Sequence, residues 1–174
     1  MAVTIVGNGG HAKVIRDLVS SQGILFHIRA LFMRYCVIAV GTNKFRMKEA
    51  LAHSEYVFPT LIHPRAIVSP LAKIGKGTVV MAGAIVQAGA VIGDHVILNS
   101  GCSVDHDCLI GDYAHIAPHA TLCGAVEIGE GAMVGAGAVC VQGARVEPWT
   151  LAKAGTVHKS KEWRENYAAI VRKG

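Results

Sequence analysis

Residues 81–110 read MAGAIVQAGAVIGDHVILNSGCSVDHDCLI, and an aliphatic residue ends each block of six. An aliphatic or small residue recurs every six positions from Ile62 to Ala152, and a small or β-branched one follows four positions after each. An α-helix, with 3.6 residues per turn, would rotate such side chains away from one another. A parallel β-helix with three short strands per coil instead turns every sixth side chain inward. The sixteen hexapeptides therefore predict a parallel β-helix over residues 61–157.

Glycines and cysteines fall into the same register. Four glycines are eighteen residues apart, and we expect them to turn the chain at one edge with positive φ; they are Gly75, Gly93, Gly111 and Gly129. Three cysteines occupy inward positions and are assigned to packing, namely Cys102, Cys108 and Cys140, whereas Cys123 is one step out of register. With no C-x-x-C pair, the five cysteines of the chain are expected to be reduced thiols.

Composition limits the classes of partner. The longest apolar stretch, residues 24–40, contains His27, Arg29 and Arg34, so it does not resemble a membrane span. Glycines 7, 9 and 10 interrupt any apolar start that could form a signal peptide, so we expect a cytoplasmic protein. Much of the net charge of +5 comes from residues 153–174, which are predicted to end in a solvated basic helix over residues 158–174. The rest of the chain has no basic stripe with aromatics, so nucleic acid is not expected.

The first sixty residues predict a small α/β domain. VTIVGNGGHA (3–12) indicates a strand, a glycine turn and a helix whose apolar face includes Ile15 and Leu18. Its G-x-G-x-x-A spacing would place backbone N–H groups where a phosphate binds well. YCVIAVG (35–41) indicates a second strand, followed by a helix that Thr42 or Asn43 could cap and that ends near Ala52. No acidic residue lies between Asp17 and Glu49, which disfavours a nicotinamide cofactor.

The stretch VDHDCLIGDYAHIAPHA (104–120) holds the candidate reactive residues. Histidine titrates near pH 7, and an adjacent carboxylate raises its pKa, so His106 with Asp107 could form a general base, with Asp105 as an alternative partner. A metal site is the competing interpretation of D-H-D and of the pair His115 and His119, but a spacing of four does not align two residues on a coil, and no metal is expected. His119 and His95 are interpreted as surface histidines.

Three stretches together resemble one family: IVGNGGHAKVIRDLV (5–19), VIAVGTNKFRMKEA (37–50) and VDHDCLIGDYAHIAPHATLCGAVEIGEGAMVGAGAV (104–139). They are similar to hexapeptide-repeat sugar acetyltransferases of the sialic-acid O-acetyltransferase type, which include UDP-4-amino-sugar N-acetyltransferases of the bacillosamine pathway. The resemblance implies a left-handed β-helix after a Rossmann-like domain (residues 1–60) that holds a nucleotide-activated amino sugar. It also implies a homotrimer with acetyl-CoA bound between neighbouring prisms, so that the active sites lie at subunit interfaces.

The resemblance also implies roles for individual residues. Gly9, Gly10, His11 and Gly41 would contact the nucleotide-linked sugar. His106 would be the general base, and Asp107 would raise its basicity. His115 would lie at the thioester end of acetyl-CoA, while Gly124 and Ala136 would line the pantetheine groove.

The chain departs from the family near residues 27–35. Members usually have about twenty further residues before the V-I-A-V-G strand, including an acidic pair near the sugar nucleotide. Either this βα unit is absent, or the sequence joins residues across a missing loop, which we favour and which a break in Cα spacing between residues 26 and 36 would reveal.

Three functions stay open on sequence alone. The leading one is acetyl-CoA-dependent N-acetylation of a nucleotide-linked, UDP-4-amino sugar. The second is O-acetylation of a sialic acid or a related sugar by the same base. The third is a non-catalytic β-helix that binds an anionic ligand, and substrate profiling with acetyl-CoA distinguishes the three.

Overall fold

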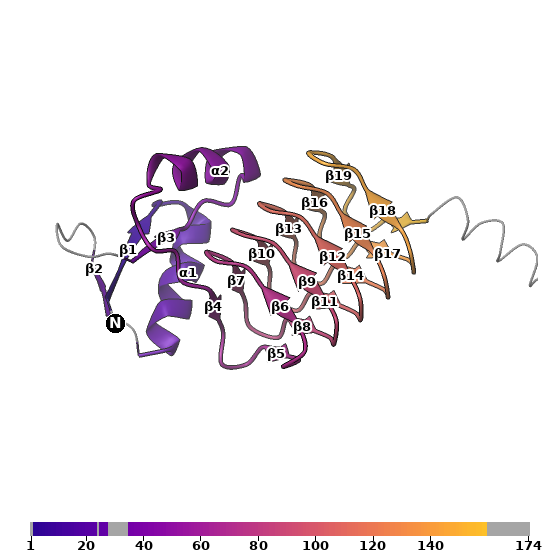
Figure 1. The fold of residues 1–174 in the computed structure, drawn as a ribbon, viewed down its shortest axis with the longest axis horizontal. Helices are drawn as coiled ribbons and strands as arrows, with labels where there is room; N and C mark the ends of the chain where they lie inside the picture. The colour runs from indigo at the N-terminus through magenta and orange to yellow at the C-terminus, as the bar shows by residue number, and fades with distance from the viewer. Residues whose placement is uncertain (1, 24, 28–34, 160–174) are drawn as a thin grey trace, which may run out of the picture.

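The computed structural model describes residues 2–23, 25–27 and 35–159, which form a small α/β unit followed by a triangular prism (Figure 1). In the α/β unit, β1 (Ala2–Val6) pairs in parallel with β2 (Leu25–His27) on one side and β3 (Cys36–Ile38) on the other. Helix α1 (Gly10–Ser21) follows β1 and α2 (Asn43–Ala52) follows β3. The strand, glycine turn and helix predicted from VTIVGNGGHA are therefore present.

The prism has three faces, each a parallel sheet of two-residue strands. The first face contains β4 (Leu61–Ile62), β7 (Val79–Val80), β10 (Ile97–Leu98), β13 (His115–Ile116), β16 (Met133–Val134) and β19 (Leu151–Ala152). The second contains β5 (Ile67–Val68), β8 (Ile85–Val86), β11 (Ser103–Val104), β14 (Thr121–Leu122), β17 (Val139–Cys140) and β20 (Val157–His158). The third contains β6 (Lys73–Ile74), β9 (Val91–Ile92), β12 (Leu109–Ile110), β15 (Glu127–Ile128) and β18 (Arg145–Val146).

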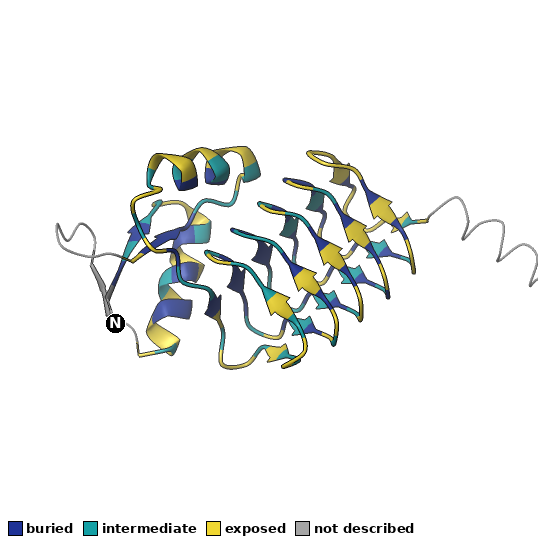
Figure 2. Ribbon diagram, in the orientation of Figure 1, coloured by how far each residue is buried: buried dark blue, intermediate teal, exposed yellow. Residues whose placement is uncertain are grey.

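Strands one coil apart pair in register at a separation of eighteen residues, as Leu98 does with Ile116. The predicted inward residues form one continuous core: from Val80 to Ala152 they are buried except for Thr150, which is exposed. Buried segments recur in successive coils of the prism (Figure 2). At the first coil Ile62 is 36% exposed, because no further coil covers that end. The left-handed parallel β-helix is confirmed, with a little over five coils.

The glycines that recur every eighteen residues are required at their corner for a different reason from the one that we expected. Gly75, Gly93, Gly111 and Gly129 do not have positive φ, so that prediction was wrong. They are required because the next coil passes close by: a Cβ on Gly93 would lie 2.8 Å from the backbone nitrogen of Asp112. Positive φ occurs two residues later in the same corner, in a row that contains Gly77, His95, Tyr113, Gly131 and Trp149. We call this edge, between the third and first faces, the third corner.

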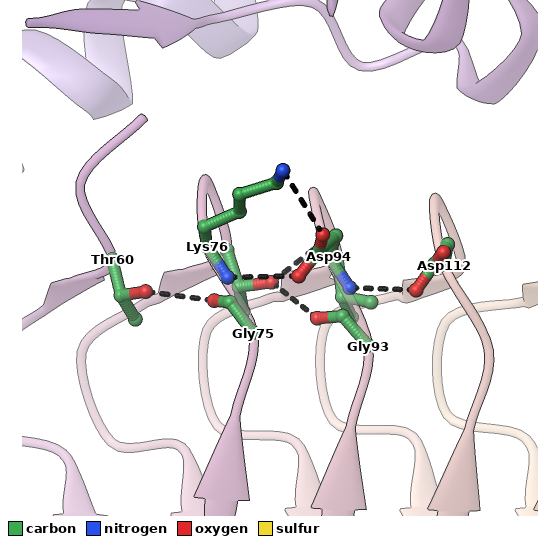
Figure 3. A network of polar contacts seen from close by, with 8 residues as sticks. Thr60, Gly75, Lys76, Gly93, Asp94 and Asp112 are labelled. Atoms are coloured by element: carbon green, nitrogen blue, oxygen red, sulfur yellow. Dashed lines mark hydrogen bonds and ion pairs between the residues drawn. The ribbon is translucent and has the colours of Figure 1, made fainter. Parts of the chain in front are cut away.

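Polar contacts stiffen the third corner along the prism axis (Figure 3). The carboxylate Oδ1 of Asp94 accepts the backbone N–H of Lys76 at 2.9 Å, and Oδ1 of Asp112 accepts that of Asp94 at 2.8 Å. The Thr60 hydroxyl donates to the Gly75 carbonyl at 2.7 Å. The coils up to Asp112 are thus fixed to one another at this corner.

The α/β unit is docked on the first face of the prism. Buried residues of α1, such as Ile15 and Leu18, share one apolar cluster with Val79 and Ile97 of the prism. This docking covers the end of the first face nearest the N-terminus, and the strands β13, β16 and β19 continue that face away from the α/β unit (Figure 1).

Some expectations fall outside the described residues. The predicted basic helix lies almost entirely in residues 160–174, and the question of a missing loop falls on residues 28–34. His158, placed in that helix by the sequence, instead belongs to β20. Cys102, Cys108 and Cys140 are buried in the prism as predicted, and all five cysteines are free. Within the described ranges, no helix is long and apolar enough to cross a membrane.

Candidate active site

A cavity of about 750 Å³ lies between the α/β unit and the prism. Its first wall is formed by the glycine turn before α1, including Gly9 and Gly10, and by the β3–α2 turn, including Gly41. Both turns lead into a helix, so backbone N–H groups at two helix N-termini border the cavity, an arrangement that favours anions. Its second wall belongs to the first face and third corner of the prism and contains Met133 and Trp149.

Arg46 of α2 joins the two walls. Its side chain is buried, and its guanidinium donates to carbonyl oxygens of both units: to Gly41 at 3.1 Å, to His95 at 2.8 Å and to Ala114 at 3.2 Å. It also donates to the side chain of Asn43, whose amide in turn donates to the Gly131 carbonyl at 3.0 Å. Among the described residues its hydrogen-bond partners are carbonyl and amide oxygens and no carboxylate, so the guanidinium charge between the two walls is not neutralised by an opposite charge.

Two histidines in the cavity are held neutral at pH 7. Burial, assisted by the charge of Arg46, lowers the pKa of His11 and the pKa of His115 from 6.5 to about 4. His115 Nε2 lies 3.1 Å from the amide nitrogen of Asn99, and its ring hydrogen-bonds to the backbone of Gly41. Within the described part of the chain, Nε2 of His11 is buried without a hydrogen-bond partner, so this polar atom is available to a ligand.

His106 and Asp107 lie elsewhere, at the corner between the second and third faces, which we call the second corner. Nδ1 of His106 is 2.8 Å from Oδ2 of Asp107. This hydrogen bond, with the nearby charge of Asp105 as a smaller cause, raises the pKa of His106 above 6.5. Asp105 uses its own Oδ1 to accept the backbone N–H of His106 at 2.8 Å. Of the two candidate partners, Asp107 therefore contacts the imidazole.

Gly124 supports this histidine from the next coil. A Cβ at Gly124 would lie 2.5 Å from Cε1 and 2.6 Å from Nε2 of the His106 ring, so only glycine allows the ring to rest there. The exposed imidazole is thus held on one side by Gly124 and at Nδ1 by Asp107, which leaves Nε2 to meet a substrate.

The predicted site residues fall into two groups and one outlier. Gly9, Gly10, His11 and Gly41 share the cavity with His115, which the resemblance had grouped with the acetyl-CoA residues. The second group, at the second corner, consists of His106, Asp107 and Gly124. Ala136 is exposed at the remaining corner and joins neither group.

The interpretation of His95 as a surface histidine was wrong. His95 is 3% exposed, stacks on Tyr113 with ring centroids 5.4 Å apart, and meets the edge of Phe58. Burial lowers its pKa to about 4. Its repeat position indicates an outward corner, and only docking of the α/β unit buries it, so hexapeptide register alone could not reveal this. Arg46 and Trp149 were missed for the same reason.

Among the residues that the structure describes, no three His, Cys, Asp or Glu side chains are grouped to hold a metal ion. His119 in particular is exposed and packs over Gly101 rather than beside His115. In the D-H-D stretch (105–107), Asp105 and Asp107 both hydrogen-bond to His106 at the second corner.

The prism, its hexapeptide register and a docked α/β unit with an anion-favouring cavity define a hexapeptide-repeat transferase. The sequence profile of the family "Bacterial transferase hexapeptide (six repeats)" matches residues 71–106, 89–124 and 107–142. The acetyltransferase domain of PglB from Neisseria gonorrhoeae FA1090 is 36% identical, with a TM-score of 0.82 and 90% coverage of both chains. The chain belongs to the family of hexapeptide-repeat sugar acetyltransferases.

Two further relatives carry informative names. UDP-N-acetylbacillosamine N-acetyltransferase of Bacillus subtilis (strain 168) is 41% identical in an alignment 110 residues long. The alignment includes 46% of this chain and 51% of the relative, so the chain spans about half the length of that curated relative. A variant of GDP-perosamine N-acetyl transferase from Caulobacter crescentus, solved with CoA and GDP-perosamine, is 32% identical with a TM-score of 0.84, covering 90% of this chain and 88% of that one.

Proposed function

We propose that this protein transfers the acetyl group of acetyl-CoA to the amine of a nucleotide-linked amino sugar, with His106 as general base. The observation that carries the proposal is the pairing of an exposed imidazole with Asp107 at 2.8 Å, in a chain similar to enzymes named for this reaction. A structure of the PglB domain with acetyl coenzyme A, 37% identical over 88% of both chains, supports acetyl-CoA as the donor.

The cavity is the proposed site for the nucleotide-linked sugar. Helix N-termini beside Gly10 and Asn43, together with the charge of Arg46, suit a diphosphate, and Nε2 of His11 offers a buried polar contact. Residues 1–60 would accordingly act as a Rossmann-like nucleotide-sugar domain. Its parallel order β2-β1-β3 and the glycine turn after β1 support that role.

The chemistry follows from the state of His106. The neutral sugar amine attacks the thioester carbonyl, a C–N bond forms, the C–S bond breaks and the CoA thiolate leaves. The amine loses one proton, which neutral His106 accepts at Nε2 while Asp107 stabilises the resulting imidazolium at Nδ1. A base of raised pKa suits this step, since it binds the proton of the amine more tightly than an ordinary imidazole does.

The two groups of residues lie at different corners of one prism, which supports a shared site between subunits. The cavity opens along the first face and third corner, whereas His106 projects from the second corner. One ligand would contact both most readily where the second corner of a neighbour meets the cavity. We therefore propose a homotrimer in which acetyl-CoA lies between prisms, with Gly124 and Ala136 along its groove and three composite sites.

The test is a panel of nucleotide-linked amino sugars assayed for thiol release from acetyl-CoA. We expect a UDP-4-amino sugar or GDP-perosamine to be acetylated and free sialic acid to be inert. His106→Ala should lower kcat by about two to four orders of magnitude with little change in acetyl-CoA affinity. Unchanged turnover in that variant would contradict the role of His106 as general base. Acetylation of free sialic acid instead would make the protein an O-acetyltransferase, and tight nucleotide binding without any thiol release would make it a binding scaffold.

A further inference from the structure

Trp149 occupies an unusual place on the cavity wall. Its backbone is left-handed, with a φ of +58°, a conformation that bulky residues rarely adopt. Two other positions of the same row, eighteen and seventy-two residues earlier, are Gly131 and Gly77. Of the six described non-glycine residues with positive φ, Trp149 is the one that lines the cavity. A large side chain is therefore kept where glycine would be the relaxed choice, and such strain is concentrated at functional sites.

The indole is also held rigidly. A Cβ on Gly131 would lie 2.5 Å from Cδ2 of Trp149, so the ring rests directly on that glycine. Gly131 is fixed in turn, because its carbonyl accepts the Asn43 side-chain amide at 3.0 Å. Trp149 nevertheless stays 36% exposed, beside Met133 and Leu151 on the same wall. One side of the residue is thus packed against the prism, while a substantial part of it stays open to a ligand.

The orientation of the proposed substrate decides what meets this ring. The phosphates suit the helix N-termini at Gly10 and Asn43, on the α/β side of the cavity. From there a nucleotide-linked sugar extends in two directions, toward the α/β sheet and toward the prism. In the proposed trimer, His106 comes from a neighbouring prism that packs beside this one, so the sugar amine, and with it the sugar end, lies on the prism side of the cavity.

We propose that the indole of Trp149 is the platform on which the sugar ring of the substrate stacks, so that Trp149 helps to select the sugar. The inference rests on the proposed function. An aromatic ring offers a large, rigid apolar surface that matches the C–H face of a deoxy sugar. Because the platform contacts the sugar and not the nucleotide, its removal should affect the two halves of the substrate differently.

The decisive variant is Trp149→Gly, which removes the ring and places glycine where the backbone favours it. The substrate is the more active of a UDP-4-amino sugar and GDP-perosamine, and the competitive inhibitor is the matching nucleoside diphosphate, UDP or GDP. We expect KM for the sugar nucleotide to rise about 10- to 30-fold, with the inhibition constant of the diphosphate unchanged. Trp149→Phe should retain most of the affinity.

A matched control is His119→Gly. His119 has a φ of +57° and its ring rests on Gly101 as Trp149 rests on Gly131, but it is exposed at another corner, away from the cavity. This variant should leave KM unchanged, and both variants should keep the denaturation midpoint of the parent protein.

Two results would overturn the inference. Equal weakening of the sugar nucleotide and the diphosphate in Trp149→Gly would place the ring against the base or phosphates. An unchanged KM would show that the ring contacts no part of the substrate. A failure of the proposed function is separate, because then the parent protein itself would release no CoA thiol with either sugar nucleotide.

Discussion

Nδ1 of His106 lies 2.8 Å from Oδ2 of Asp107, and Asp107 holds this position with a left-handed backbone, at a φ of +58°. Aspartate is among the few residues that tolerate that conformation, so the corner both turns the chain and aims the carboxylate. The pair is formed by two adjacent residues in the turn that connects β11 and β12. Its geometry therefore survives in a single subunit, before any partner or substrate is present.

Asp107→Asn should move the acidic limb of the pH profile. The hydrogen bond from Asp107 is the largest cause that raises the pKa of His106, so its loss brings that pKa down toward 6.5. Because the base must be neutral to act, kcat/KM should then fall at lower pH than in the parent, while the plateau drops about ten-fold or more. Asp105→Asn is the control and should shift the limb less. A larger shift in Asp105→Asn than in Asp107→Asn would show that Asp105, and not Asp107, orients the imidazole.

His115→Ala should raise KM for the sugar nucleotide more than KM for acetyl-CoA. His115 shares its cavity with Gly10 and His11 and hydrogen-bonds to the Gly41 backbone, so its loss disturbs the proposed nucleotide-sugar site. Initial-rate measurements with each substrate varied in turn provide the test. A rise confined to acetyl-CoA would support the thioester contact that the family resemblance implies and would contradict our prediction.

Arg46→Met should destabilise the folded protein by at least about 3 kcal/mol. The substitution leaves the carbonyl oxygens of His95, Gly41 and Tyr113 without the guanidinium donor that they have in the parent. Urea denaturation measures the loss. Lys48→Met, an exposed site on the same helix, is the control and should stay within about 0.5 kcal/mol of the parent. A small effect of Arg46→Met would mean that the two units dock without the guanidinium.

Acid should weaken the fold between about pH 6.5 and pH 4. His11, His95 and His115 have folded-state pKa values of about 4, below their ordinary 6.5, so in this window the unfolded chain takes up protons that the folded chain does not. The free energy of unfolding should fall as the pH decreases through the window, and these groups should have no effect above it. At pH 5, one such histidine lowers the free energy of unfolding by about 2 kcal/mol relative to its value above the window.

His95→Phe removes the contribution of His95 to this pH dependence of stability. The ring keeps its place between Phe58 and Tyr113 but no longer titrates, so the difference in urea midpoint between pH 7 and pH 5 should shrink. His119→Phe, at an exposed position with the same backbone conformation, should leave that difference as it is. Equal behaviour of the two variants would show that buried His95 does not resist protonation.

Mixed trimers should recover activity that each parent variant lacks. Gly9→Tyr places a large side chain on the cavity wall, where a Cβ meets nothing within 4 Å, while His106→Ala removes the base. If the site is shared, each trimer that contains both variants has one native site out of its three, about one third, built from an intact cavity and a neighbour's intact His106. Co-expression with two affinity tags and an assay of the doubly tagged fraction tests this. No recovery would confine the site to one subunit.

The hexapeptide register predicted nearly every inward residue of the prism, because the same position of each six-residue block points inward. The position of Asp107 next to His106 was equally local, so that pair was predictable. His95, Arg46 and Trp149 were not, since their environments arise where the α/β unit meets the third corner, at contacts between residues far apart in sequence. The glycine series beginning at Gly75 was recognised for the wrong reason, since close approach of the next coil, rather than φ, requires it.

The eighteen-residue coil also constrains how such a protein can change length in evolution. Removing eighteen residues between Val80 and Val104 would delete one coil and return every later residue to the same corner. Removing six or twelve would rotate His106 to a different corner, away from the neighbour that its base must serve. Insertions and deletions upstream of the reactive histidine therefore keep its corner only in whole coils, and each would also move the cavity wall at Met133 and Trp149 by one coil relative to the α/β unit. Beyond the last strand of the cavity, at Leu151, neither constraint applies.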